Sequence, residues 1–212
     1  MRPPQSWRRA RLTLAIAVVT AVAFLVIDVL NYEEWATIWG GFIPARLAFG
    51  QDEAWAPFWL TPLTATLVHA DWLHLALNLL ILIFCGRPTE AALGPWGLGI
   101  LYLIGAYAAA GAQYALAPTA AIPMVGASGA ISAVLGAYAI LFGRNKVTLA
   151  NQRLAMWLNA LWLMAAWIVL QVIVGLTLAR EGILIAVGAH AGGFVAGVLL
   201  ANPLLLLRYR KA

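Results

Sequence analysis

Two side chains that can act as a nucleophile and a general base lie inside apolar segments of this sequence. Ser128 begins one apolar run within Gly126-Ala127-Ser128-Gly129, and His190 lies within another. Polar groups are rare in apolar helices, and those that occur are candidates for function. A serine hydroxyl attacks a carbonyl carbon when a neighbouring histidine accepts its proton. The two residues therefore predict serine-type acyl transfer if the fold brings them together.

His74 and Asn78 add hydrogen-bond donors to this pair. They lie four residues apart, so they share one face of a helix. An imidazole N–H and an amide N–H are suited to stabilising a developing oxyanion. At 1.5 Å per residue, Ser128 lies ~22 Å and His74 ~18 Å above the expected inner ends of their helices, which is a similar depth. Each residue also has a structural alternative. Ser128 can cap its helix, and His74 and Asn78 can form hydrogen bonds between helices.

The remaining candidates favour structural roles. His69 is interpreted as an interface or packing residue, and Asp71 as the N-cap of the helix that follows it rather than as a triad acid. Cys85 is the single cysteine and is expected to be a buried, inert thiol. His69 and His74 do not have the spacing of a zinc-binding helix pair, so no metal site is predicted.

The elements that carry these residues are expected to be membrane-spanning helices. The chain of 212 residues is 64% hydrophobic and 10% charged, which leaves too few polar residues to cover a soluble domain. Helices of ~20 apolar residues cross a bilayer because they pair all of their backbone groups. Six apolar segments are predicted to do so: Leu12–Leu30, Trp72–Cys85, Trp96–Ala117, Ser128–Phe142, Leu154–Leu178 and Ile183–Ala201. The predicted organisation is one membrane domain over residues 12–207 between basic tails at 1–11 and 208–212.

The charged residues predict the orientation of this six-helix bundle. With six crossings, one face collects 11 of the 13 basic residues and leaves only Arg46 and Arg180 on the other. The eleven are Arg2, Arg8, Arg9, Arg11, Arg87, Arg144, Lys146, Arg153, Arg208, Arg210 and Lys211. The positive-inside rule then places both termini in the cytoplasm. Because the basic residues lie at segment ends and not on one exposed patch, no nucleic-acid partner is expected.

A long first outer loop, Asn31 to Asp71, carries many aromatic residues. They favour short helices in the outer membrane interface, as lipid-facing anchors or, alternatively, as substrate contacts.

Small residues predict how two helices pack. Gly193 and Gly197 lie four residues apart after His190, and Gly129 and Gly136 lie on the Ser128 segment. Such faces allow close helix approach.

These motifs together resemble the rhomboid family over about residues 59–197. His69, His74 and Asn78 are similar to its H-x4-H-x3-N motif on the second helix. The residues from Gly126 to Gly129 are similar to its G-x-S-G motif at the start of the fourth helix. Those from His190 through Gly193 to Gly197 are similar to its H-x-x-G-x-x-x-G motif on the sixth. The stretch from Gly86 to Glu90 is similar to the turn motif that ends the second helix.

The resemblance implies an all-α membrane protein with a six-helix rhomboid-like bundle. It also implies serine proteolysis within the membrane without metal, cofactor or acid. Ser128 would be the nucleophile and His190 the general base, while His74, Asn78 and the Ser128 backbone N–H would form the oxyanion hole. Expected partners are single-pass transmembrane substrates, cut near the outer face, and the lipid bilayer. A bacterial inner membrane is the expected location, and the oligomeric state stays open.

Two positions depart from the family pattern. Trp59 is followed by Leu60, where the family often has arginine after tryptophan. Ser132 stands four residues after Ser128, where the family often has an aromatic ring that stacks on the base. Either the site has room for a ring beside His190, or Ser132 bonds to the Ser128 carbonyl and a neighbouring bulky group fills the gap.

Two other functions remain in competition with proteolysis. A transporter or channel also places polar residues near mid-membrane, but it predicts repeated halves, which the sequence lacks. A rhomboid-fold protein that binds or escorts clients without cutting them would lack the serine or the histidine, and this chain has both.

Overall fold

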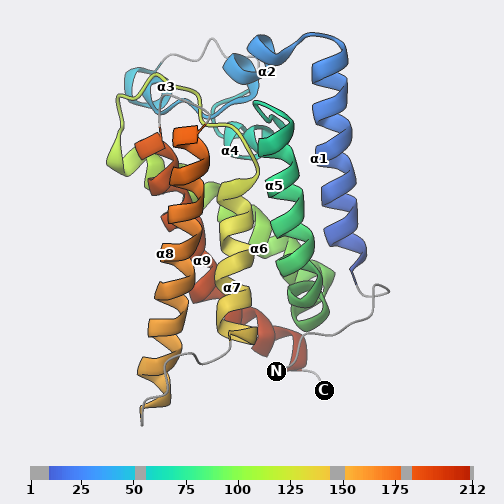
Figure 1. The fold of residues 1–212 in the computed structure, drawn as a ribbon, viewed down its shortest axis with the longest axis vertical. Coiled ribbons are helices and arrows are strands. Elements are labelled where there is room, and N and C mark those ends of the chain that lie inside the picture. Colours follow the sequence, from blue (N-terminus) through green and yellow to red (C-terminus); the bar gives the residue numbers. More distant parts are fainter. Residues whose placement is uncertain (1–9, 51–55, 144–150, 178–182, 211–212) are drawn as a thin grey trace.

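The computed structural model describes residues 10–50, 56–143, 151–177 and 183–210, and these residues form a bundle of helices (Figure 1). The main helices are α1 (Arg11–Val29), α5 (Trp72–Ile81), α6 (Arg87–Leu116), α7 (Ser128–Phe142), α8 (Gln152–Thr177) and α9 (Ile183–Tyr209). A π-helical segment, η3 (Leu82–Gly86), joins α5 to α6. The first loop carries α2 (Glu33–Gly40), α3 (Pro44–Phe49), α4 (Thr61–Thr64) and the 3-10 turn η2 (Ala65–Leu67).

Four stretches of the described residues are long and apolar enough to cross a membrane. They are Arg11–Val29, Trp72–Leu116, Leu154–Ile173 and Val187–Tyr209, and Ser128–Phe142 is a shorter apolar helix. Large apolar side chains are exposed along them, among them Val18 on α1, Leu199 on α9 and Leu161 on α8. Surface of this kind is suited to lipid rather than water. The fold class is therefore all-α and of membrane type, while the count of six crossings stays a prediction.

The stretch Trp72–Leu116 joins the predicted second and third segments. Its 45 residues are far more than one crossing requires. The path bends sharply at Gly94, whose φ of 78° and ψ of 167° are not helical, and Pro95 follows it. Glycine adopts this φ without the steric cost that a Cβ brings. In Figure 1, α5 descends and the later part of α6 ascends, so the chain reverses within this stretch.

α7 occupies the centre of the bundle and contacts α5, α6, α8 and α9 (Figure 1). Thirteen of its fifteen residues are buried, most of them small. Close approach on both sides depends on glycine. A Cβ on Gly105 of α6 would collide with Ala133, and one on Gly136 would collide with the Phe194 backbone of α9. The short side chains of α7 thus allow three helices to pack with their backbones in near contact.

Glu90 and Arg208 tie three helices together at one end of the bundle. The buried Glu90 carboxylate accepts hydrogen bonds from the Leu12 and Thr13 backbone N–H groups and from the Thr13 hydroxyl. It thereby satisfies donors that the first turn of α1 leaves unpaired. Arg208 donates to the Ala91 carbonyl at 2.7 Å. The beginning of α1 and the end of α9 therefore lie on the same side of the bundle.

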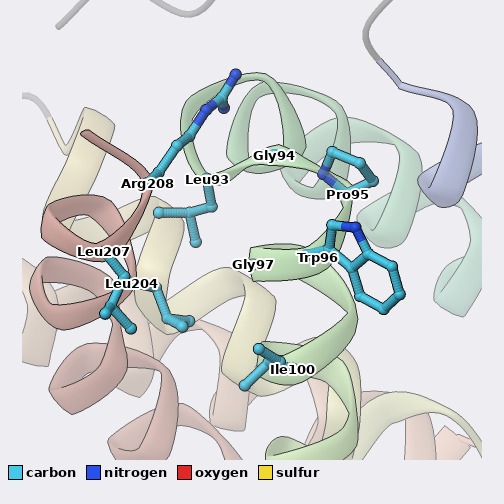
Figure 2. Close-up of a pocket in the computed structure, with 9 residues that line it drawn as sticks. All are labelled: Leu93, Gly94, Pro95, Trp96, Gly97, Ile100, Leu204, Leu207 and Arg208. Atoms are coloured by element: carbon cyan, nitrogen blue, oxygen red, sulfur yellow. The ribbon is translucent and has the colours of Figure 1, made fainter. Parts of the chain in front are cut away.

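A cavity of about 370 Å³ lies at this same end, between the Gly94 bend and the end of α9 (Figure 2). Its lining is apolar apart from Arg208, with Trp96, Ile100 and Leu204 among the side chains that form it. His190 precedes Arg208 by eighteen residues of the same helix, or ~27 Å. This cavity therefore lies well away from Ser128 and His190.

The first loop contains the short helices expected from its sequence, and it packs against the loop that precedes α7. Phe42 and Met124 exchange backbone hydrogen bonds of 3.0 and 2.8 Å, and the Ala45 N–H donates to the Ala120 carbonyl. Within the loop, Arg46 donates to the Ile38 carbonyl. The first loop thus fixes the segment through which the chain enters α7.

Candidate active site

Ser128 and His190 meet in the interior, although 62 residues separate them in sequence. The Ser128 Oγ lies 2.7 Å from the His190 Nε2. Ser128 is the first residue of α7 and is 6% exposed, and His190 on α9 is 4% exposed. This is the distance at which an imidazole accepts a hydroxyl proton. The described part of the chain thus contains a buried serine–histidine pair in hydrogen-bond contact.

Glycines on α7 and α9 permit this contact. A Cβ on Gly193 would collide with the Gly129 carbonyl oxygen, and a Cβ on Gly197 would collide with the Ala133 carbonyl. The same positions carry the small-residue faces predicted from the sequence. Because His190 lies one turn before Gly193, and Ser128 adjoins Gly129, the close approach of the two helices begins beside the serine–histidine pair.

His74 and Asn78 lie on α5 beside the start of α7. A Cβ on Gly126 would lie 2.6 Å from the His74 imidazole, so this ring packs against the backbone two residues before Ser128. Gly126 has a φ of 107°, which favours glycine. Asn78 is 2% exposed, and its side-chain amide donates to the His74 carbonyl at 2.8 Å. The Asp71 carboxylate accepts from the His74 N–H at 2.7 Å, so Asp71 is the N-cap that the sequence predicted.

His69 has a more specific place than the interface or packing role predicted for it. It is 2% exposed, and its Nε2 accepts a long hydrogen bond of 3.4 Å from the Ala127 N–H, next to Ser128. Its ring also lies 5.0 Å from that of His74. Burial, followed by the charge of a protonated His74, lowers the pKa of His69 to about 3. His69 is therefore neutral at ordinary pH, as an acceptor of the Ala127 N–H must be.

Ser132 adopts the second arrangement predicted for it, in which it bonds to the Ser128 carbonyl and a bulky neighbour fills the space beside it. Its hydroxyl donates to the Ser128 carbonyl at 2.7 Å. The space beside it is filled by Trp167 of α8, whose indole N–H donates to the Ser132 Oγ at 2.8 Å. The indole also meets the His190 ring edge-on, with centroids 5.9 Å apart. The expectation of free room for a ring beside His190 is thus wrong, because a residue distant in sequence occupies it.

Sequence reasoning missed Trp167 and Gln171, which lie one turn apart on the same face of α8. The Gln171 side-chain nitrogen lies 3.2 Å from the His190 Nε2. Gln171 carries a signal, since it is an amide within a strongly apolar segment. Trp167 carries none, because three tryptophans lie between residues 155 and 168 and sequence alone does not show which of them faces the site.

Comparison with known proteins matches most of this chain to one family. The family model of the rhomboid domain matches residues 56–207. Rhomboid protease GlpG of Pectobacterium atrosepticum is 31% identical over 198 residues, which cover 90% of this chain and 61% of the relative. RHOMBOID-like protein 1 of Arabidopsis thaliana is 31% identical over 168 residues, covering 78% of this chain and 38% of the relative.

A second plant relative, the chloroplastic Rhomboid-like protein 11 of Arabidopsis thaliana, is 39% identical over 84 residues, which cover 40% of this chain and 29% of the relative. The chain spans about three-fifths of the length of the bacterial relative and less of the plant ones. The family model covers most of the chain, and the apolar helices fit an integral membrane protein. This chain therefore belongs to the rhomboid family.

Proposed function

We propose that this protein is an intramembrane serine endopeptidase that uses Ser128 as nucleophile and His190 as general base. The single observation that carries this proposal is the 2.7 Å contact between the Ser128 Oγ and the His190 Nε2 in a buried site. Family membership and the protease name of the bacterial relative support it. A binding or escort protein would gain nothing from a buried serine aligned with a histidine.

In the proposed reaction, the Ser128 hydroxyl passes its proton to the His190 Nε2 as its oxygen attacks the scissile carbonyl carbon. The carbonyl oxygen becomes an oxyanion, which the His74 ring N–H, the Asn78 amide and the Ser128 backbone N–H stabilise. His190 then protonates the leaving amine, and the peptide C–N bond breaks. His190 then takes a proton from a water molecule, whose oxygen attacks the acyl carbon. As the ester C–O bond breaks, His190 returns this proton to the Ser128 Oγ and the carboxyl product leaves.

The proposed substrates are single-pass transmembrane proteins. A substrate helix must expose its carbonyl to reach Ser128, so cleavage is expected where that helix is unstable near the outer face. The proposed topology has six crossings and a long first outer loop, with the junction of Glu90 and Arg208 on the cytoplasmic side, and the distribution of basic residues supports it. A bacterial inner membrane is the proposed location.

Fluorophosphonate labelling of the detergent-solubilised protein tests this proposal. The probe forms a covalent bond with an activated serine, so the wild-type protein is expected to label at Ser128. Ser128→Ala and His190→Ala are expected to abolish labelling, while Ser6→Ala, in the basic tail, serves as the matched control and labels normally. Labelling of Ser128→Ala as strong as that of the wild type would refute the assignment of the nucleophile.

A further inference from the structure

The orientation of His190 depends on contacts other than the usual bond to an acid. A serine hydroxyl that donates to the Nε2 requires a neutral imidazole with its proton on the Nδ1. The His190 Nδ1 is buried and has no hydrogen-bond partner among the described residues. In triad enzymes, a carboxylate at this nitrogen holds the ring in place. The ring of His190 must therefore be held through its faces, its edges and the Nε2.

Trp167 supplies such a contact from a different helix. Its side chain is 4% exposed, and its ring meets the His190 ring edge-on at 63°. Edge-to-face pairs of aromatic rings are attractive at this separation of 5.9 Å. Since the indole touches the imidazole directly, it limits rotation of that ring about its side-chain bonds.

The other end of the indole is fixed to the helix that carries Ser128. Its N–H donates to the Ser132 Oγ at 2.8 Å, and the Ser132 hydroxyl donates to the Ser128 carbonyl at 2.7 Å. Ser132 is fully buried, so water does not compete for these bonds. Two consecutive hydrogen bonds therefore fix Trp167 relative to Ser128, while its ring fixes His190.

We propose that Trp167 is a positioning residue for the general base, held by Ser132 and supplied by α8 rather than by the helix of the nucleophile. This inference rests on the proposed proteolytic function. Trp167 acts through His190, because its ring meets the imidazole and its N–H is bonded to the Ser132 hydroxyl. Its loss is therefore expected to lower kcat and to leave KM unchanged.

The first test is the Trp167→Ala variant, assayed for fluorophosphonate labelling rate and for cleavage of a transmembrane reporter. Misplacing a catalytic group by about 1 Å costs on the order of 100-fold, so a loss of about 10- to 100-fold in both rates is expected. Trp157→Ala, which removes a half-exposed tryptophan from the same helix, is the matched control and is expected to keep the wild-type rates. A folded Trp167→Ala protein with unchanged kcat, or with a changed KM alone, would overturn the proposal.

The second test supplies the aromatic ring beside His190 from position 132 of α7 instead of from Trp167. Because the Ser132 Oγ lies 2.8 Å from the indole nitrogen, a ring at position 132 points into the space that the indole leaves. Ser132→Phe alone is expected to be inactive or poorly folded. Combined with Trp167→Ala, it is expected to recover about 10-fold of the lost labelling rate. A double variant no faster than Trp167→Ala would count against a role for the ring.

A hydrogen-bond cycle covers the case in which Trp167→Ala does not fold. Trp167→Phe and Ser132→Ala each remove the bond between the two side chains and are expected to slow labelling about 2- to 10-fold. Because they remove the same bond, the double variant is expected to be no slower than the slower single variant. Additive losses would overturn the proposal. A wild-type protein that does not label at all would instead refute the proposed function.

Discussion

Replacing Glu90 by glutamine is expected to destabilise the fold without touching the site. One carboxylate oxygen of Glu90 accepts the Leu12 N–H at 2.9 Å, and the other accepts the Thr13 N–H and hydroxyl at 2.7 Å each. A glutamine oxygen can keep the pair of bonds from Thr13, but its NH₂ group then faces the Leu12 N–H, where donor meets donor. The first turn of α1 also loses a negative charge near its positive end.

The expected cost follows from these contacts. Leaving a buried donor unpaired costs about 1–3 kcal/mol, and the lost helix-dipole interaction adds about 0.3–1 kcal/mol. Glu90→Gln should therefore lower the free energy of unfolding by about 1–4 kcal/mol, measured by denaturant titration of the purified protein. Thr13→Val removes only the hydroxyl bond and should cost about 1 kcal/mol. Equal stability of Glu90→Gln and the wild type would refute this account of the junction.

Three further outcomes are expected. Asn78→Ala and His74→Ala should each slow reporter cleavage by about 10²–10³-fold while Ser128 still labels. If His74→Ala abolishes labelling as completely as His190→Ala does, the general base has been assigned to the wrong histidine. Gly193→Ala should separate α7 from α9, lower the free energy of unfolding by about 1–3 kcal/mol and slow labelling. Gly111→Ala, whose added Cβ would meet nothing within 4 Å, should leave both stability and labelling unchanged. His69 is neutral when folded, with a pKa near 3 against an ordinary 6.5, so the unfolded chain binds the extra proton and stability falls as pH drops from about 6.5 towards 3. His69→Gln should show a weaker fall over this range, and an unchanged pH dependence would contradict the burial of His69.

Much of the candidate site was accessible from sequence because its chemistry lies in local motifs. The spacing of His74 and Asn78, and the small residues after His190, report directly on helix faces. The ends of the apolar segments were also close to those of the helices for α1 and α7. These features depend on residues near one another in the chain, where period and composition are informative.

Features that depend on tertiary packing were not accessible in this way. Helix α9 continues to Tyr209, eight residues beyond the predicted end of the last segment, because Arg208 finds carbonyl partners near Glu90. No local pattern shows that Trp167 faces His190, since several tryptophans of α8 have equivalent surroundings in sequence. The support of the Ala127 N–H by His69 likewise joins residues 58 positions apart.

Cleavage of a single-pass transmembrane reporter by the purified protein in liposomes tests the central claim most directly. The products are identified by mass spectrometry, and Ser128→Ala and His190→Ala are reconstituted in parallel at matched amounts. The account predicts one cut within or beside the reporter's membrane segment by the wild type, and losses of several orders of magnitude in both variants. Cleavage by Ser128→Ala at a rate near that of the wild type would contradict it.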